Sequence, residues 1–233
     1  MARSTTGYFS LASFKFLRAL ARHNERDWFI AHKNEFEVQL RQPMLRLIAD
    51  LADPLHAISP HFVASPKPQG GSMFRIYRDI RYARDKRPYK EWISARFFHE
   101  RTRELMGDAP FFYLHLQPGR CFVGGGVWHP QPSALKRIRA YLVNNPVSWK
   151  ATVHAPAFRS VFTLAGDSLV RPPQGYDPNH TLIEDLKRKD FIVHGALSDE
   201  EMLRPDLQKH VTRLFRQLAP LNDWLCGALD LEF

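Results

Sequence analysis

Basic side chains are concentrated in the stretch FRIYRDIRYARDKRPYKEW, which runs from Phe74 to Trp92. Between Arg75 and Lys90 there are seven bases and two acids, so this stretch supplies +5 of the chain's net charge of +9. Concentrated positive charge attracts anions such as nucleotides, phosphates, nucleic acids, acidic proteins or membrane surfaces. The first question about function is therefore which anion this stretch could bind.

Guanidinium groups bind carboxylates and phosphates through paired hydrogen bonds, and a neighbouring carboxylate can orient them. Apolar alternation predicts a strand over residues 72–82 that places Arg78 on its apolar face, where an unpaired charge costs several kcal/mol. We therefore predict a basic pocket for a phosphate- or carboxylate-bearing small molecule. The charges are expected from Arg75, Arg78, Arg81, Lys86 and Lys90. Asp79 and Asp85 would orient them and, with Lys86, are the acid/base candidates if the protein is an enzyme.

The walls of this pocket are expected to be aromatic, with a glycine run beside them. The residues are Tyr89, Tyr113 and Trp128, followed by Gly124, Gly125 and Gly126. Backbone N–H groups of such a run can line an anion site. The alternative is a bulge or a close approach of two backbones. His115 alternates with Tyr113 on one strand face and is either a site residue or a structural one.

Two other hypotheses use the same tract. A nucleic-acid-associated or protein-interaction module would present residues Arg75 to Lys90 as an exposed surface, with tyrosines stacking on bases. A structural role would make the Arg/Asp pattern an internal ion-pair lattice that holds the sheet to its helices. A concave wall would favour the pocket, and a convex ridge would favour the exposed surface.

Familiar catalytic motifs are absent from the sequence. It contains no GxGxxG, GxxxxGK[ST], HExxH or GxSxG, and Cys121 and Cys226 stand alone without metal-ligand spacing. We therefore predict no metal site, and neither a cofactor, a reaction nor an oligomeric state follows from these residues. Two isolated cysteines are typical of a reducing compartment.

The composition is that of a globular protein, with 44% hydrophobic and 24% charged residues among 233. No apolar run approaches the ~20 residues of a membrane span. Residues 1–24 lack acids, as transit peptides do, but Phe14, Leu17 and Leu20 repeat at helical spacing and favour a first core helix. We expect a cytoplasmic protein without membrane contact.

Helical patterns at both chain ends enclose the strands. Strands are expected over residues 60–63, 72–82, 168–171 and 191–197. Another strand is expected after the loop at PYKEW, and residues 111–126 are expected to form a hairpin that turns at Pro118-Gly119. Asn24 resembles a helix N-cap, and Pro220 is expected to open the last helix. Hairpin signals favour an α+β fold, with a largely antiparallel sheet of five or six strands packed by the terminal helices.

The stretch FRIYRDIRYARDKRPYK resembles the signature of a bacterial and fungal family of conserved proteins, domain of unknown function 2461. The similarity begins at FLRALARHNERDWFIAHKNEFE, continues in FYLHLQPGRCFVGGGVWHP, and ends with RPPQGYDPNHTLIEDLKRKDF and the segment at Pro220-Leu221. Tyr82 stands where the family usually has Phe. The resemblance implies a tail at residues 1–9 and one domain over residues 10–233, and it implies no reaction, cofactor or catalytic residue.

Overall fold

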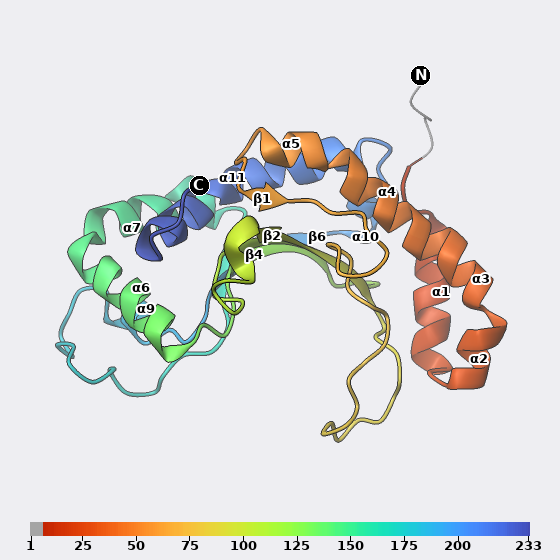
Figure 1. Ribbon diagram of the computed structural model, residues 1–233, viewed down its shortest axis with the longest axis horizontal. Coiled ribbons are helices and arrows are strands. Elements are labelled where there is room, and N and C mark those ends of the chain that lie inside the picture. The colour runs from red at the N-terminus through yellow and green to blue at the C-terminus, as the bar shows by residue number, and fades with distance from the viewer. Residues whose placement is uncertain (1–6) are drawn as a thin grey trace.

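The computed structural model describes residues 7–233, and residues 1–6 of the expected tail lie outside the described residues. Its strands are β1 (Phe62–Val63), β2 (Ile93–His99), β3 (Phe111–Leu116), β4 (Cys121–Val127), β5 (Thr163–Ala165) and β6 (Phe191–Leu197). They form one sheet in the order β1-β2-β3-β4-β6-β5, with every neighbouring pair antiparallel (Figure 1). The α+β class with an antiparallel sheet of five or six strands is confirmed.

Helices precede the sheet in the chain. They are α1 (Leu11–Arg22), α2 (Arg26–Ala31), α3 (Lys33–Phe36), a π-helical turn (Glu37–Arg41), α4 (Gln42–Asp50) and α5 (Ala52–His56). Ser10 caps α1, and Pro43 lies in the first turn of α4, directly after the π-helical turn. Asn24 is not an N-cap as expected, because its side chain bonds the backbone of Tyr89 instead.

Three of the six later helices begin at proline. They are α6 (Pro132–Asn144), α7 (Pro146–Val153), α8 (Pro156–Arg159), α9 (Ile183–Leu186), α10 (Asp199–Met202) and α11 (Leu207–Ala228), and a 3-10 turn, Glu100–Thr102, follows β2. Ser198 and Glu201 form a capping box on α10. Pro220 does not open a last helix, because α11 runs through it without interruption.

One face of the sheet carries the core. Figure 1 shows α5 and α11 lying over this face, and α11 packs directly on β4. A Cβ on Gly125 would lie 2.7 Å from the side chain of Leu218, so glycine permits this close packing. Asn222 of α11 donates to the carbonyl of Phe111 at 3.1 Å. The opposite face of the sheet is not covered in this way and stays open between the two ends of the molecule.

Two of the expected strands are not formed. Ser168 makes only an isolated bridge with Arg188, and the edge strand β5 lies a few residues earlier. Residues 72–82 make only isolated bridges, Met73 with Ala95 and Tyr77 with Tyr89.

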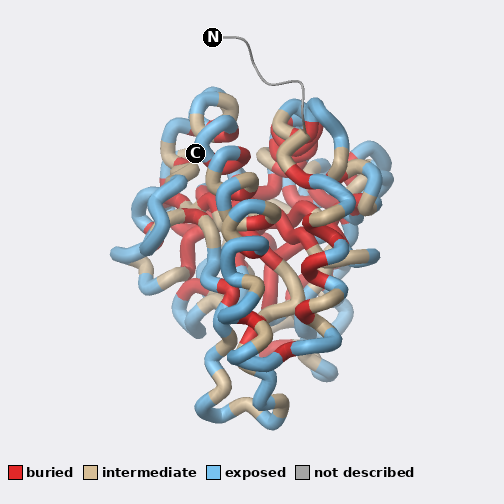
Figure 2. The backbone as a smooth tube through the Cα atoms, turned by 90° about the vertical axis from the view of Figure 1, so that its right-hand side faces the viewer, coloured by how far each residue is buried: buried red, intermediate tan, exposed pale blue. Residues whose placement is uncertain are grey.

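Residues 75–90, named here the basic loop, take the place of that second strand. They project from the molecule (Figure 1), and the tip is exposed or half-buried (Figure 2). Asp79 accepts from the backbone N–H of Arg81 at 3.2 Å, and Asp85 from that of Arg87 at 3.0 Å. In such turns an aspartate side chain accepts from the backbone N–H two residues later. These local bonds compete with the backbone hydrogen bonds of a β-strand.

Candidate functional site

The open face of the sheet is built from aligned rows of side chains. In the central row, Arg96 of β2 stands opposite Tyr113 of β3, which stands opposite Gly124 of β4 and then His194 of β6. Because alternate residues of a strand share a face, all four lie on the side away from α11. Gly124 has no side chain, so the row leaves a gap above the sheet between the side chains of Tyr113 and His194.

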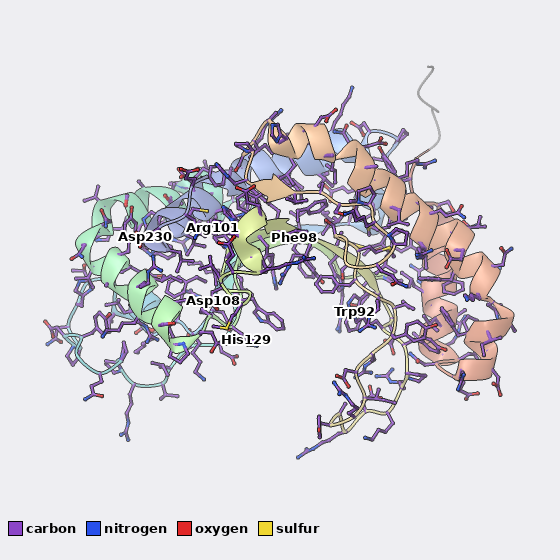
Figure 3. All side chains as sticks on the ribbon, viewed as in Figure 1. Trp92, Phe98, Arg101, Asp108, His129 and Asp230 are labelled. Carbon is purple, nitrogen blue, oxygen red and sulfur yellow. The ribbon has the colours of Figure 1, made fainter. Side chains whose placement is uncertain are left out.

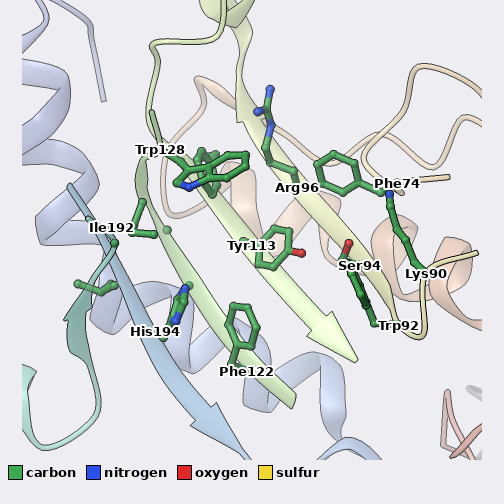
Figure 4. A pocket seen from close by; sticks show the side chains of 15 residues that line it. Phe74, Lys90, Trp92, Ser94, Arg96, Tyr113, Phe122, Trp128, Ile192 and His194 are labelled. Carbon is green, nitrogen blue, oxygen red and sulfur yellow. The ribbon is translucent and has the colours of Figure 1, made fainter. Parts of the chain in front are cut away.

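A cavity of about 530 Å³ occupies this face (Figure 4). We call it the aromatic groove. It is lined by Phe74, Lys90, Trp92, Ser94, Arg96, Phe111, Tyr113, Phe122, Gly124, Gly125, Trp128, Gly166, Ile192, Val193 and His194. Figure 3 places Trp92 toward the basic loop and His129, the neighbour of Trp128, on the opposite side. Six of the lining side chains belong to Phe, Tyr or Trp. The surface is therefore predominantly apolar and carries few charges.

Arg96 is one of two cations that line this surface. Its guanidinium lies 5.4 Å from the centroid of the Phe111 ring, and in the view of Figure 4 it extends between Trp128 and Phe74. Burial lowers the pKa of Arg96. Within residues 7–233 the structure gives its side chain no ion pair and no hydrogen bond. A half-buried guanidinium without a carboxylate partner is costly, and a bound anion would relieve that cost.

Lys90 supplies the second cation of the groove. Its Nζ donates to the carbonyl of Arg75 at 2.8 Å and lies 5.3 Å from the centroid of the Phe74 ring. Burial, with the nearby charge of Arg75, lowers the pKa of Lys90. This amine is thus held by neutral partners, and its charge is available to a ligand.

Polar groups of β3 and of the residue that follows it form a hydrogen-bonded line. The Tyr113 hydroxyl lies 3.2 Å from Nδ1 of His115, whose Nε2 lies 3.2 Å from Oε1 of Gln117. Because the amide oxygen can only accept, Nε2 carries the proton and Nδ1 accepts from Tyr113. Burial lowers the pKa of His115 to about 4, so this imidazole is neutral at pH 7. Burial also lowers the pKa of His194 across the groove.

The structure brings together only part of the residue set expected from the sequence. Lys90, Tyr113, Gly124, Gly125 and Trp128 line the aromatic groove. Arg75, Arg78, Arg81, Lys86 and Tyr89, with Asp79, Asp85 and Gly126, are not among its lining residues. The glycine run belongs to a strand paired on both sides, which supports the close-approach interpretation over an amide-lined anion site.

Three of the seven bases of the basic loop are paired with carboxylates, and the loop keeps a net charge of +5. Asp85 pairs with Arg87 and with Arg78, each at 2.6 Å. The hydrogen bond from Arg87, and next the one from Arg78, holds the pKa of Asp85 well below its usual range. Asp79 pairs with Arg81 at 2.7 Å, and Arg87 also contacts Glu91. Arg78 is only partly buried and pairs with Asp85 in the loop, whereas we expected it on the apolar face of a strand. These pairs are local to residues 78–91 and do not connect the sheet to its helices.

Asn24 anchors the base of the basic loop, next to Lys90 and Trp92. Its buried side chain donates to the Tyr89 carbonyl and accepts from the Tyr89 N–H, both at 3.0 Å. The Tyr89 ring stacks on Phe29 of α2, with centroids 4.2 Å apart. The helices before the sheet thereby set the position of the groove's loop-side wall.

Replacing Asn24 with aspartate is expected to lower the free energy of unfolding by about 2 kcal/mol. The change keeps the shape and one acceptor, but it removes the donor and turns a buried carboxylate toward the Tyr89 carbonyl. Chemical denaturation measures the effect. The same change at exposed Asn34 is the matched control and should leave stability unaltered; equal stability of the two variants would contradict the anchoring role.

Several groove residues were missed in the sequence, chiefly Arg96, Ser94, Phe122 and His194. A signal for Arg96 was present, because it is the only charged residue in the apolar strand ISARFF. The other three were hidden, since their alternation does not reveal which face the helices leave open. Among the described residues, no cluster of three or more His, Cys, Asp or Glu side chains could hold a metal ion. Nor does any helix of residues 7–233 have the length and apolarity to cross a membrane.

Comparison with known proteins places these observations in a family. No curated protein and no solved structure matches the chain significantly. The model of a family described as conserved hypothetical protein (DUF2461) matches residues 12–224, which is nearly the whole chain. The match includes the helices before the sheet, all six strands and most of α11. The chain therefore belongs to the family of conserved hypothetical proteins DUF2461.

Proposed function

We propose that the aromatic groove binds a small organic anion that has a planar apolar body and a carboxylate or phosphate group held by Arg96. The observation that carries the proposal is the half-buried Arg96 guanidinium, which has no anionic partner among residues 7–233. Guanidinium forks match carboxylate and phosphate geometry, and pairing would offset the cost of burial. Lys90 adds a second positive charge on the same surface.

The rest of the groove supports an apolar body on that anion. Tyr113 and Phe122 lie with ring centroids 5.5 Å apart, and Trp128 is exposed on the opposite side. Exposed aromatic surface of this kind gains free energy when a flat ligand removes it from water. The volume of about 530 Å³ falls within the ~300–1,000 Å³ of small-molecule sites.

The exposed basic loop supports the alternative, a surface for nucleic acid or an acidic protein. Tyr82 at its tip is 95% exposed, and the loop is a convex projection. Against this, most of its arginines are already paired within the loop. Length-dependent RNA or DNA binding that weakens steeply between 50 and 200 mM salt, about tenfold or more, would support this alternative.

Calorimetric titration with N-(2-naphthoyl)glycine and its neutral amide tests the groove proposal. We expect the acid to bind at least about tenfold more tightly than the amide, because a charge-assisted hydrogen bond contributes ~1.5–3 kcal/mol. Arg96→Met should abolish this preference without loss of stability, since it removes an unpaired charge. Arg81→Met, outside the groove, is the control and should bind like the wild type. Equal binding of acid and amide would overturn the proposal.

A further inference from the structure

A second cavity, of about 460 Å³, adjoins the aromatic groove. We call it the side cavity. Phe74 and Arg96 line both cavities, so the guanidinium stands where the two meet. Other residues that line the side cavity are Val63, Ser72, Phe98, Glu100, Thr102 and Arg103. It lies between the segment after β1 and the turn that follows β2.

Strand geometry explains why the two cavities adjoin on one face of the sheet. Ser94, Arg96 and Phe98 are alternate residues of β2 and therefore share the open face of the sheet. The chain at residues 72–74 runs along the edge of β2, where Phe74 N–H donates to the Ser94 carbonyl and Arg96 N–H to the Ser72 carbonyl. A ligand held at Arg96 can thus extend past Phe74 along the same face without crossing the sheet.

The side cavity is more polar than the groove. Within residues 7–233, Arg103 makes no ion pair or hydrogen bond through its side chain, although its neighbour Arg101 is paired with Glu104 at 2.9 Å. The one carboxylate that lines the cavity, Glu100, is already bonded to His61 at 2.6 Å. The buried hydroxyl of Thr102 finds no partner among the described residues. An additional anionic group in the cavity would pair with the exposed guanidinium of Arg103.

We propose that the side cavity binds a second acidic group of the same ligand, so that the ligand is an aryl compound with two acidic groups at one end. The aryl body would occupy the aromatic groove, the first acidic group would bind Arg96, and the second would bind Arg103. This inference rests on the proposed function of the groove. It narrows the ligand class from organic anions in general to aryl-substituted diacids.

Three probes that share one aryl body test the inference: N-(2-naphthoyl)glycine, N-(2-naphthoyl)glutamine and N-(2-naphthoyl)glutamate. The last two have nearly the same shape and differ by one charge. We expect the glutamate probe to bind the wild-type protein about five- to tenfold more tightly than the glutamine probe. Arg103→Gln should erase that preference and leave the affinity for the glycine probe unchanged, whereas Arg96→Met should weaken all three.

Arg101→Gln is the matched control, because it removes the same charge from a paired arginine that does not line the cavity. A general attraction of the basic protein for dianions would be reduced equally in both variants, and that result would overturn the subsite. Equal binding of the glutamate and glutamine probes would also overturn it, while the proposed function would stand if the glycine probe still depended on Arg96. Failure of all three probes to bind would overturn both.

Discussion

Gly126→Ala is expected to lower the free energy of unfolding by more than about 3 kcal/mol. A Cβ at this position would lie 2.0 Å from the carbonyl oxygen of Phe191 and 3.0 Å from Cα of Ile192, both in the backbone of the neighbouring strand β6. Gly126 also has φ of +114°, a conformation that side-chain-bearing residues rarely adopt. Backbone strain of ~1–3 kcal/mol and the clash between two central strands act together.

Gly119→Ala separates these two contributions. Gly119 has φ of +72°, but nothing lies within 4 Å of its would-be Cβ, so only the conformational cost of about 1 kcal/mol applies. Both variants are measured by urea denaturation with linear extrapolation. If Gly126→Ala lost no more stability than Gly119→Ala, then β4 and β6 would not be packed as closely as the structure indicates.

Strands with local signals could be predicted from the sequence. The hairpin of β3 and β4 has apolar alternation on both sides of Pro118-Gly119, and the residues of β6 agree with the expected range, 191–197. Such segments have one buried face and turn residues at their ends, so neighbouring residues determine the outcome. The resemblance to the family also predicted a similarity over nearly the whole chain, and the match over residues 12–224 confirms it.

Tertiary packing decided the elements that could not be predicted. Pro220 lacks the N–H that the carbonyl of Arg216 would accept in a regular helix. Arg216 and Pro220 both lie on the exposed side of α11, where water can bond that carbonyl, while Leu218 and Leu221 are buried on the other side. The buried face therefore keeps the helix continuous through the proline.

The candidate site depends on distant parts of the chain. Arg96, Tyr113, Gly124 and His194 become neighbours only through the pairing of four strands. Alternation indicated that Tyr113 could share a face with His115, but not that this face would remain open. The charge concentration near Arg78 was a misleading guide to the groove, because the basic loop projects from the molecule and Arg78 is paired with Asp85, whereas Arg96 lies in an apolar strand.

Asp190→Ala is expected to lower the free energy of unfolding by about 3 kcal/mol and to weaken ligand binding in the aromatic groove. The Asp190 side chain is 1% exposed. Its carboxylate accepts from the backbone N–H of His129 at 2.7 Å and of Asp167 at 2.8 Å, and it pairs with Nδ1 of His129 at 2.9 Å. Removing the buried carboxylate leaves two backbone N–H donors without an acceptor, at a cost of ~1–3 kcal/mol each.

The effect on binding follows from what Asp190 holds in place. His129 has φ of +50°, and the bond from its N–H stabilises this unusual turn. The turn sets the direction of Trp128, whose ring stacks on His129 with centroids 4.3 Å apart and lines the groove. Gly166, another lining residue, directly precedes Asp167.

Denaturation and calorimetric titration of the same Asp190→Ala protein check both parts of this prediction. Asp79→Ala, which removes an exposed carboxylate paired with Arg81, is the matched control and should change neither stability nor affinity measurably. Conditions are chosen so that the variant is folded during titration, because loss of affinity must be read on native protein. A destabilised variant that still bound the naphthoyl acid with wild-type affinity would show that Asp190 supports the fold without positioning Trp128, and the wall of the groove would then be set by β4 alone.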